Sequence, residues 1–200
     1  IAVVDSLLTR ESIYYAPYGA TIPDETSIDF DEAWGGTWVN LGYTTAPLSM
    51  QWDEELFELE LEQLTNPVKG MKTKESLMFE TTLAELTAAN LKLALGSTST
   101  ISTTAAGAGQ KGYSQFAFGG EVNLPVYAFG FEGFTLDANN NKLPKRIFVY
   151  RASFSLGGNL EFTKRAAAGI PLKIRAWADT SQTAGQQLAI FQSVTAVATS

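Results

Sequence analysis

The sequence contains neither cysteine nor histidine in its 200 residues. Without cysteine the chain has no disulfide bond, no thiolate metal ligand and no thiol nucleophile. Without histidine it lacks the commonest general base, the commonest metal ligand and any triad that uses imidazole. Only paired carboxylates, a desolvated lysine or a serine–lysine pair remain for catalysis. We therefore expect no catalytic, cofactor-binding or metal site, and assembly in a reducing or neutral compartment.

Long apolar runs are also missing. No stretch of about 18 apolar residues occurs, so the sequence predicts no membrane-spanning helix and no membrane partner. Asp5, Arg10 and Glu11 interrupt the first apolar residues, which argues against a signal peptide. Ile1 is not an ordinary translation start, and we expect residues upstream of it. The length fits a single domain, with 45% hydrophobic and 18% charged residues.

The densest pattern lies in residues 57–62, where apolar and acidic residues alternate strictly. The apolar set is Phe57, Leu59 and Leu61, and the acidic set is Glu58, Glu60 and Glu62. A period of two predicts a half-buried β-strand. Three unpaired carboxylates on one face are too costly to bury. They therefore face water, a cavity or the cations of a partner.

Several roles are open to these three glutamates. Residues two apart on a strand lie about 6.6 Å from each other, a spacing compatible with the carboxylate pair of a glycoside hydrolase, although every polar strand face offers it. Carboxylates also suit calcium or magnesium, but no nearby loop supplies carbonyl ligands at a recognisable spacing. The plainest interpretation is a solvated strand face.

The neighbouring segments predict more strands and one helix. Residues 38–44 and 48–52 are predicted to form a hairpin with its turn at Ala46-Pro47, and 72–83 to form a further strand. Thr87 is a good helix N-cap and Gly96 a good stop, with Leu91, Ala94 and Leu95 as the apolar stripe between them.

The remaining segments complete a predicted single domain over 1–200. Residues 1–33 are predicted as an N-terminal arm or loop region that includes a short strand at 12–16. Residues 97–112 form a Ser/Thr/Ala/Gly tract predicted to be a flexible loop, and 195–200 a frayed tail. The tract has P-loop spacing only superficially, because Tyr113 stands where the lysine belongs.

The second half of the chain is rich in strand patterns. Strands are predicted at 114–118, 122–136, 146–156, 160–164 and 170–178, with a strong turn at 137–142, and 186–194 is predicted as a short helix or a last strand. Eight to ten strands and one short helix predict a mainly β fold: an antiparallel β-sandwich or barrel with long loops.

Two clusters of side chains allow a nucleic-acid interpretation. The aromatic residues of 116–134 would suit base stacking, but alternating aromatics with few basic neighbours favour a sandwich core. The basic residues would suit a phosphate-binding patch, but the net charge of −7 favours intersubunit contacts or solvated faces. These basic residues are Lys69, Lys72 and Lys74, and separately Arg146, Arg151, Lys173 and Arg175.

Charge is unevenly distributed along the chain. Residues 1–62 hold thirteen acids and one base, whereas 63–200 hold eight acids and thirteen bases. A solvated surface explains this split, and so does a protomer whose acidic and basic faces meet between neighbours. In the second case the Lys69–Lys72–Lys74 group contacts acids of the next protomer. The candidate acids are Asp29, Asp31 and Glu32, or Asp53 and Glu54.

Three segments resemble the tail tube (major tail) proteins of long-tailed bacteriophages: Trp38-Val-Asn-Leu-Gly-Tyr-Thr44, Glu60-Leu-Glu-Gln63, and the stretch from Thr82 to Gly96. The Tyr15-Ala-Pro-Tyr-Gly19 opening is similar as well. The resemblance is concentrated over 34–96, and over 113–180 only the long-strand pattern agrees.

The resemblance implies a structural, non-enzymatic virion protein of the phage tail. Its copies would be assembled in the host cytoplasm into hexameric rings that stack as a tube. Tape measure and terminator proteins would be further partners, and double-stranded DNA would pass through without sequence-specific binding. Glu58, Glu60 and Glu62 would then face the lumen and repel phosphate. The alternatives are a β-sandwich subunit of another assembly, such as a capsid decoration or fibre protein, and a carboxylate-dependent hydrolase.

Overall fold

The computed structural model describes residues 12–59, 66, 68–160 and 169–197. These form one eight-stranded antiparallel sheet, a separate two-stranded sheet and one helix. The elements are β1 (Ser12–Pro17), β2 (Val39–Asn40), β3 (Thr44–Leu59), β4 (Lys69–Leu83), α1 (Ala88–Ala94), β5 (Ser102–Thr104), β6 (Tyr113–Gln115), β7 (Tyr127–Leu136), β8 (Lys142–Leu156), β9 (Ile170–Ala176) and β10 (Ala189–Ser193).

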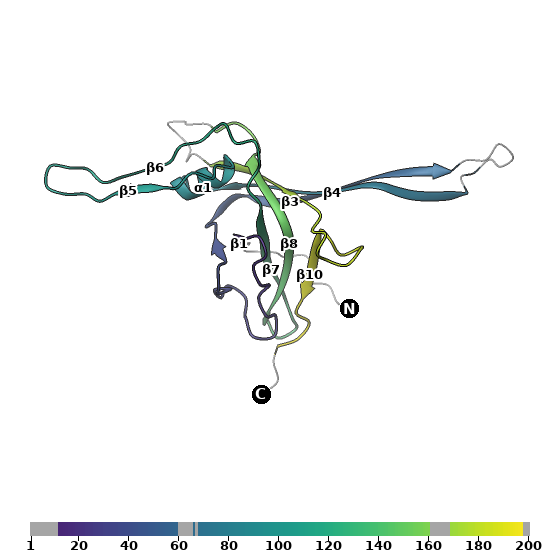
Figure 1. Ribbon diagram of the computed structural model, residues 1–200. Coiled ribbons are helices and arrows are strands. Elements are labelled where there is room, and N and C mark those ends of the chain that lie inside the picture. The colour runs from purple at the N-terminus through teal and green to yellow at the C-terminus, as the bar shows by residue number, and fades with distance from the viewer. Residues whose placement is uncertain (1–11, 60–65, 67, 161–168, 198–200) are drawn as a thin grey trace.

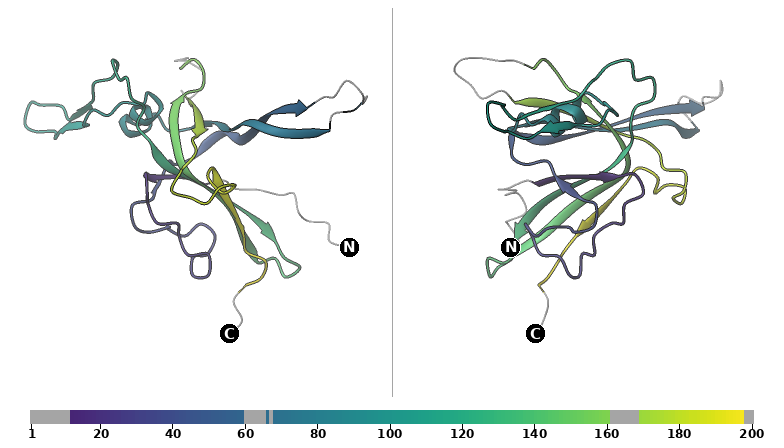
Figure 2. Two further views of the ribbon diagram at one scale, coloured as in Figure 1. Left: turned by 45° about the vertical axis from the view of Figure 1, so that its right-hand side comes forward. Right: turned by 60° about the vertical axis from the view of Figure 1, so that its left-hand side comes forward.

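The large sheet runs in the order β2-β1-β7-β8-β9-β4-β3. Strand β8 is shared: one edge pairs with β7, while the other pairs with β9 over 152–156 and with β10 over 145–149. The sheet splits along this edge and doubles back, so that β3, β4 and α1 lie in one layer and β1, β7 and β10 in another (Figure 2). The sheet remains open rather than closing into a barrel.

The main core lies between these two layers. Phe79 of β4 contacts Phe129 of β7 with ring centroids 5.2 Å apart, although the two strands are not neighbours in the sheet. Phe154 of β8 and Ile174 of β9 are buried in the same cluster. Burial of this apolar surface is the main stabilising contribution to the fold. The predicted fold class, mainly antiparallel β with one short helix, is confirmed.

The helix α1 forms where the sequence predicts it. The Thr87 side chain accepts a hydrogen bond from the Asn90 backbone N–H at 3.1 Å, and Gly96 follows the helix with a φ of +60°, a conformation that favours glycine. The helix buries Asn90, Leu93 and Ala94. Of the predicted stripe only Ala94 is therefore fully buried, while Leu91 and Leu95 are half-buried. The Asn90 amide is satisfied there because it donates to the Leu41 and Glu85 carbonyls.

The predicted hairpin of 38–44 with 48–52 is wrong. Only β2 forms in the first segment, and β3 runs without a turn from Thr44 through Ala46-Pro47 to Leu59, paired with β4. β3 is the last strand of the sheet, and a proline is tolerated on an edge strand because its missing N–H need not pair. Register shifts at Ala46 mark the irregularity instead.

The second half of the chain follows its predicted pattern more closely. The strands at β7, β8 and β9 and the turn at 137–142 are present, and the alternative at 186–194 resolves to strand β10. Strand β5 lies inside the 97–112 tract and pairs with β6, which follows the tract. The prediction at 160–164 lies almost wholly outside the described residues. So do residues 1–11 of the predicted arm, whereas β1 pairs with both β2 and β7.

Two projections leave the body in opposite directions (Figure 1). One is the β3–β4 hairpin. The other contains β5, β6 and the loop between them. Both projections carry exposed apolar side chains.

Candidate assembly surfaces

The β3–β4 hairpin has two unpaired backbone edges among the described residues. β4 pairs with β9 only from Met78 to Leu83, so its segment from Lys69 to Leu77 is paired with β3 alone. β3 is the end strand of the sheet, and from Ser49 to Leu59 no other described strand pairs with its outer side. Unpaired N–H and C=O groups of this kind are a template for adding a strand from another chain.

Both faces of the hairpin are exposed. Phe57 and Leu59 of β3 are 55% and 46% exposed, and Met71, which lies opposite Phe57, is 53% exposed. Residues opposite each other in an antiparallel pair share a face, so these three form one apolar patch, which we call the tip patch. The opposite face carries Trp52 and Leu56, also exposed. The half-buried strand predicted here is therefore wrong for the isolated chain.

The acidic candidates of the same strand are only partly described. Glu58 is exposed and lies opposite Gly70 on the face away from the tip patch. Glu60 and Glu62 lie outside the described residues. The lumen-facing role of all three stays a prediction.

The predicted lysine group meets acids of its own hairpin. Lys72 Nζ lies 3.0 Å from Glu54 and 3.6 Å from Glu75, and Lys74 Nζ lies 2.7 Å from Glu55. The hydrogen bond between Lys72 and Glu54 raises the pKa of the lysine and lowers that of the glutamate. All these side chains are solvent-exposed, so the pairs are weak and exchangeable. Lys69 and Asp53 are exposed at either end of the same region.

A groove of about 800 Å³ lies beside the free edge of β4. Its walls are the hairpin from Trp52 and Lys72–Leu77 on one side, and residues 175–178 and 185–189 on the other. Arg175 stacks on Trp177 at 4.7 Å, and Lys72 lies 5.5 Å from the Trp52 ring. The groove thus offers an unpaired strand edge with basic and aromatic side chains around it.

A second set of exposed apolar side chains lies in β6 and in the segment that follows it. Tyr113, Phe118, Val122 and Leu124 are exposed there, Val122 almost completely. The predicted aromatic core is confirmed for Phe129, Phe131 and Phe134, which are buried, but Phe118 is exposed.

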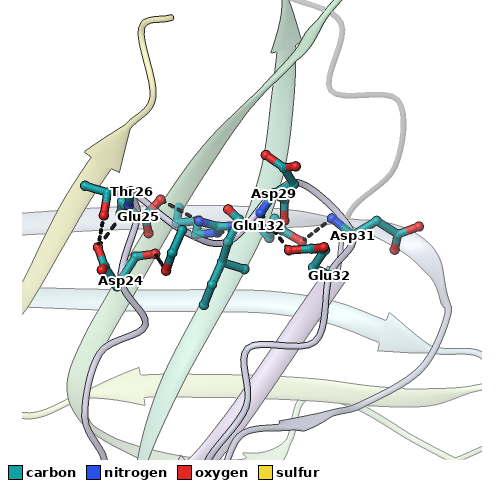
Figure 3. Close-up of polar contacts among 10 residues, drawn as sticks. Asp24, Glu25, Thr26, Asp29, Asp31, Glu32 and Glu132 are labelled. Carbon is teal, nitrogen blue, oxygen red and sulfur yellow. Dashed lines mark hydrogen bonds and ion pairs between the residues drawn. The ribbon is translucent and has the colours of Figure 1, made fainter. Parts of the chain in front are cut away.

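The predicted intersubunit acids Asp29, Asp31 and Glu32 are exposed on the loop formed by residues 18–38. Hydrogen bonds to carboxylates hold the backbone of these residues in place. The Asp31 N–H donates to the Glu132 carboxylate at 3.2 Å, and Asp31 adopts a φ of +68° (Figure 3). The Glu32 carboxylate accepts the Asp29 N–H at 3.0 Å. Contact with a neighbour stays a prediction for all three.

Arg146 lies beneath this loop and is fully buried. The sequence prediction that grouped it with solvated or intersubunit bases is therefore wrong. It contacts Glu132 of β7 and Glu25 of the loop, and its guanidinium lies 5.7 Å from the Trp34 ring. One signal was available: Glu132 and Arg146 each interrupt an apolar, aromatic strand pattern, one with an acid and the other with a base.

Within the described ranges, no three acidic side chains come together as a set that could hold a metal ion. Over those same ranges no helix is long and apolar enough to cross a membrane.

Comparison with protein families gives one match. A family model described as phage tail tube protein matches residues 9–192, nearly the whole chain. A comparison with curated proteins finds no match.

Proposed function

Because the chain belongs to the phage tail tube proteins, we propose that its copies form rings, with six copies the expected number, which stack into a passive conduit for DNA. The protein is a structural component of the phage tail, where it assembles with other copies and with other tail components. Tape measure and terminator proteins are the proposed further partners, and the host cytoplasm is the proposed place of assembly.

The single observation that carries the ring proposal is the β3–β4 hairpin with two free edges. Strand β3 offers one edge and the Lys69–Leu77 part of β4 offers the other. When the β3 edge of one copy pairs with the β4 edge of the next, each copy uses two different surfaces. Such head-to-tail contacts close into a ring if the rotation between copies allows it.

Charge favours this pairing over the alternatives. Between Asp53 and Glu58, β3 carries four acids, whereas β4 carries three lysines between Lys69 and Lys74. Opposite charge on the two joined edges favours the correct partner and speeds encounter. Pairing β3 with a second β3 would instead bring acids together. The ion pairs within each hairpin are exposed, so they can exchange for pairs between copies.

Stacking of rings needs further contacts. We assign these to the tip patch. The Lys69, Lys72 and Lys74 group is the proposed partner of acids on the next protomer, whether that protomer lies in the same ring or in the next one. The candidate acids are Asp29, Asp31 and Glu32, or Asp53 and Glu54. The acidic residues Glu58, Glu60 and Glu62 are assigned to the lumen, where negative charge keeps the DNA phosphates from binding.

The absence of cysteine makes the edge pairing directly testable. Single-cysteine variants are made in β3, at Gln51 or Asp53, and in β4, at Lys74 or Ser76, and are co-expressed in pairs. We expect at least one β3–β4 combination to give a disulfide-linked dimer on a non-reducing gel, because the Cα atoms of joined strands come within disulfide reach. Single variants expressed alone serve as controls. A disulfide-linked dimer of a β3 variant expressed alone would show β3–β3 pairing. If no β3–β4 combination gives a disulfide-linked dimer, edge pairing is refuted.

The lumen assignment has its own test. The triple change Glu58→Lys, Glu60→Lys and Glu62→Lys leaves the fold intact and slows DNA ejection if the glutamates line the lumen. The same change blocks assembly if they face a basic neighbour. Normal assembly with normal ejection would show that they are merely solvated.

A further inference from the structure

Arg146 and Glu132 form a buried ion pair inside the sheet. They lie opposite each other in β8 and β7, and both side chains are fully buried. Arg146 donates from Nε to Glu132 Oε1 at 2.9 Å and from Nη2 to the same oxygen at 2.6 Å. A buried charge pair needs such hydrogen bonds to offset the loss of water.

The loop formed by residues 18–38 is attached to this pair at several points. Arg146 Nη1 donates to Glu25 Oε2 at 2.5 Å. Its Nη2 donates to the backbone carbonyls of Ile28 and Asp29 at 3.0 and 3.1 Å. The loop returns one bond, from the Asp31 N–H to Glu132. Figure 3 shows loop residues on both sides of Glu132, with Asp24, Glu25 and Thr26 on one side and Asp31 and Glu32 on the other.

The charges in this cluster do not cancel. One guanidinium lies between two carboxylates, and only the Glu25 side chain is slightly exposed, at 15%. A net negative charge in a site so poor in water is unfavourable. We propose that the cluster is a proton-linked latch: Glu25 binds a proton when the 18–38 loop lies on the sheet, and the loop is held more firmly as it does.

The geometry selects Glu25 as the carboxylate that takes the proton. Glu132 accepts two hydrogen bonds from Arg146 and one from the Asp31 N–H, so its carboxylate is well supplied with donors. Glu25 accepts one bond at Oε2, and its Oε1 is buried with no hydrogen-bond partner among the described residues. Burial raises the pKa of Glu25, and this outweighs the opposing attraction of Arg146.

The direction of the pH effect follows from linkage. Because the pKa of Glu25 is higher with the loop closed than in an open, solvated loop, the closed state binds the proton more tightly. The extra stability of the closed loop is complete below the ordinary pKa of a glutamate. It is lost as pH rises through the raised pKa of the folded protein.

The other groups around Glu25 do not reverse this direction. Asp24 on the loop and Glu132 of β7 both raise the pKa of Glu25, and Arg146 of β8 lowers it. Hydrogen bonds from Thr26 lower the pKa of Asp24, which therefore stays ionised. From β1, Tyr14 is neutral, since burial followed by Glu132 raises its pKa. From β10, the residue opposite Arg146 is Gln192, a neutral amide.

The latch also determines how the loop presents its exposed acids. Asp29 and Asp31 are held through their own backbone groups, one on Arg146 and the other on Glu132. Opening the loop therefore moves the acids assigned above to contacts with a neighbouring copy. It also separates Trp34, which the loop carries, from Tyr14 and Phe148, against which it packs; the Tyr14 and Trp34 rings stack at 4.0 Å in the closed loop.

The test uses the full chain at a concentration where sedimentation shows monomers. Carbon-13 NMR follows the Glu25 carboxyl through a pH titration, and we expect its midpoint to lie above the ordinary pKa of a solvated glutamate. Hydrogen exchange at the Asp31 amide, corrected for intrinsic rate, reports loop opening. As pH rises through the raised pKa of Glu25, the protection of the Asp31 amide should fall. The total fall should be up to about tenfold for each unit by which the pKa of Glu25 is raised. A Glu25 midpoint at or below that ordinary value would overturn the latch.

Two variants separate the latch from general acid effects. Glu25→Gln keeps a hydrogen-bond acceptor but carries no charge, so the pH dependence of Asp31 protection should disappear. Glu32→Gln, on the same loop, should retain the wild-type dependence. If Glu25→Gln shows the same pH dependence as the wild type, the proposal is overturned. If that variant does not fold, the wild-type titration still decides.

Discussion

The tip patch gives the sharpest quantitative prediction. The double change Phe57→Ser with Leu59→Ser removes two apolar side chains that a neighbouring copy could cover. In the isolated chain Phe57 is 55% exposed and Leu59 46% exposed, so about half of each remains to be buried on assembly. Full burial of a leucine or phenylalanine contributes about 1.5–3 kcal/mol, so the two together forfeit about 1.5–3 kcal/mol per contact between copies. At tenfold per 1.4 kcal/mol, the concentration needed for assembly rises about 10-fold to 150-fold.

The assay is light scattering over a dilution series, followed by sedimentation of the assembled fraction. The thermal midpoint of the monomer should change little, because neither side chain is in the core. Gln51→Ser, on the same strand and face, removes no apolar surface and serves as the matched control. An assembly concentration within twofold of wild type for the double variant would refute the claim that another copy covers the tip patch.

Three further predictions concern packing, the buried charge and the charge split. A Cβ added by Gly130→Ala meets Cη2 of Trp34 at 2.7 Å, so we expect the free energy of unfolding in urea to fall by about 1–3 kcal/mol. The control Gly70→Ala, whose Cβ has nothing within 4 Å, should change it little. Equal stabilities of the two variants would contradict this packing. Arg146→Met leaves two buried carboxylates uncompensated and should cost about 3–5 kcal/mol in the same assay, and a loss below about 1 kcal/mol would mean the cluster is solvated. Charge reversal of the lysine group should shorten the tubes seen by electron microscopy. Salt should partly restore their length, because screening is strong beyond about 8 Å. Tubes of unchanged length across a salt series would mean that the uneven charge along the chain is only a solvated surface. The lysine group changed to glutamate is Lys69, Lys72 and Lys74.

Local chemistry predicted those parts of the fold whose signals are local. Thr87 and Gly96 bracket α1 because capping and a positive φ depend on neighbouring residues alone. The 137–142 turn follows in the same way, since the Asp137 side chain accepts the Asn139 and Asn141 N–H groups, each at 2.8 Å.

The misses all depend on tertiary position. Ala46-Pro47 looked like a turn, and only the place of β3 at the sheet edge lets the strand continue through it. Arg146 looked like a surface base, and its burial requires two acids distant in sequence to meet it. The alternation at Phe57 and Leu59 predicted a buried face, but no part of the described chain covers it. We attribute that face to contact with another copy.

We propose that copies of this chain join through two different surfaces into stacked rings. Negative-stain electron microscopy of the purified full chain over a concentration series tests this proposal. We expect rings with an open centre that lengthen into tubes as concentration rises. Monomers at every concentration, or a closed dimer that grows no further, would contradict it.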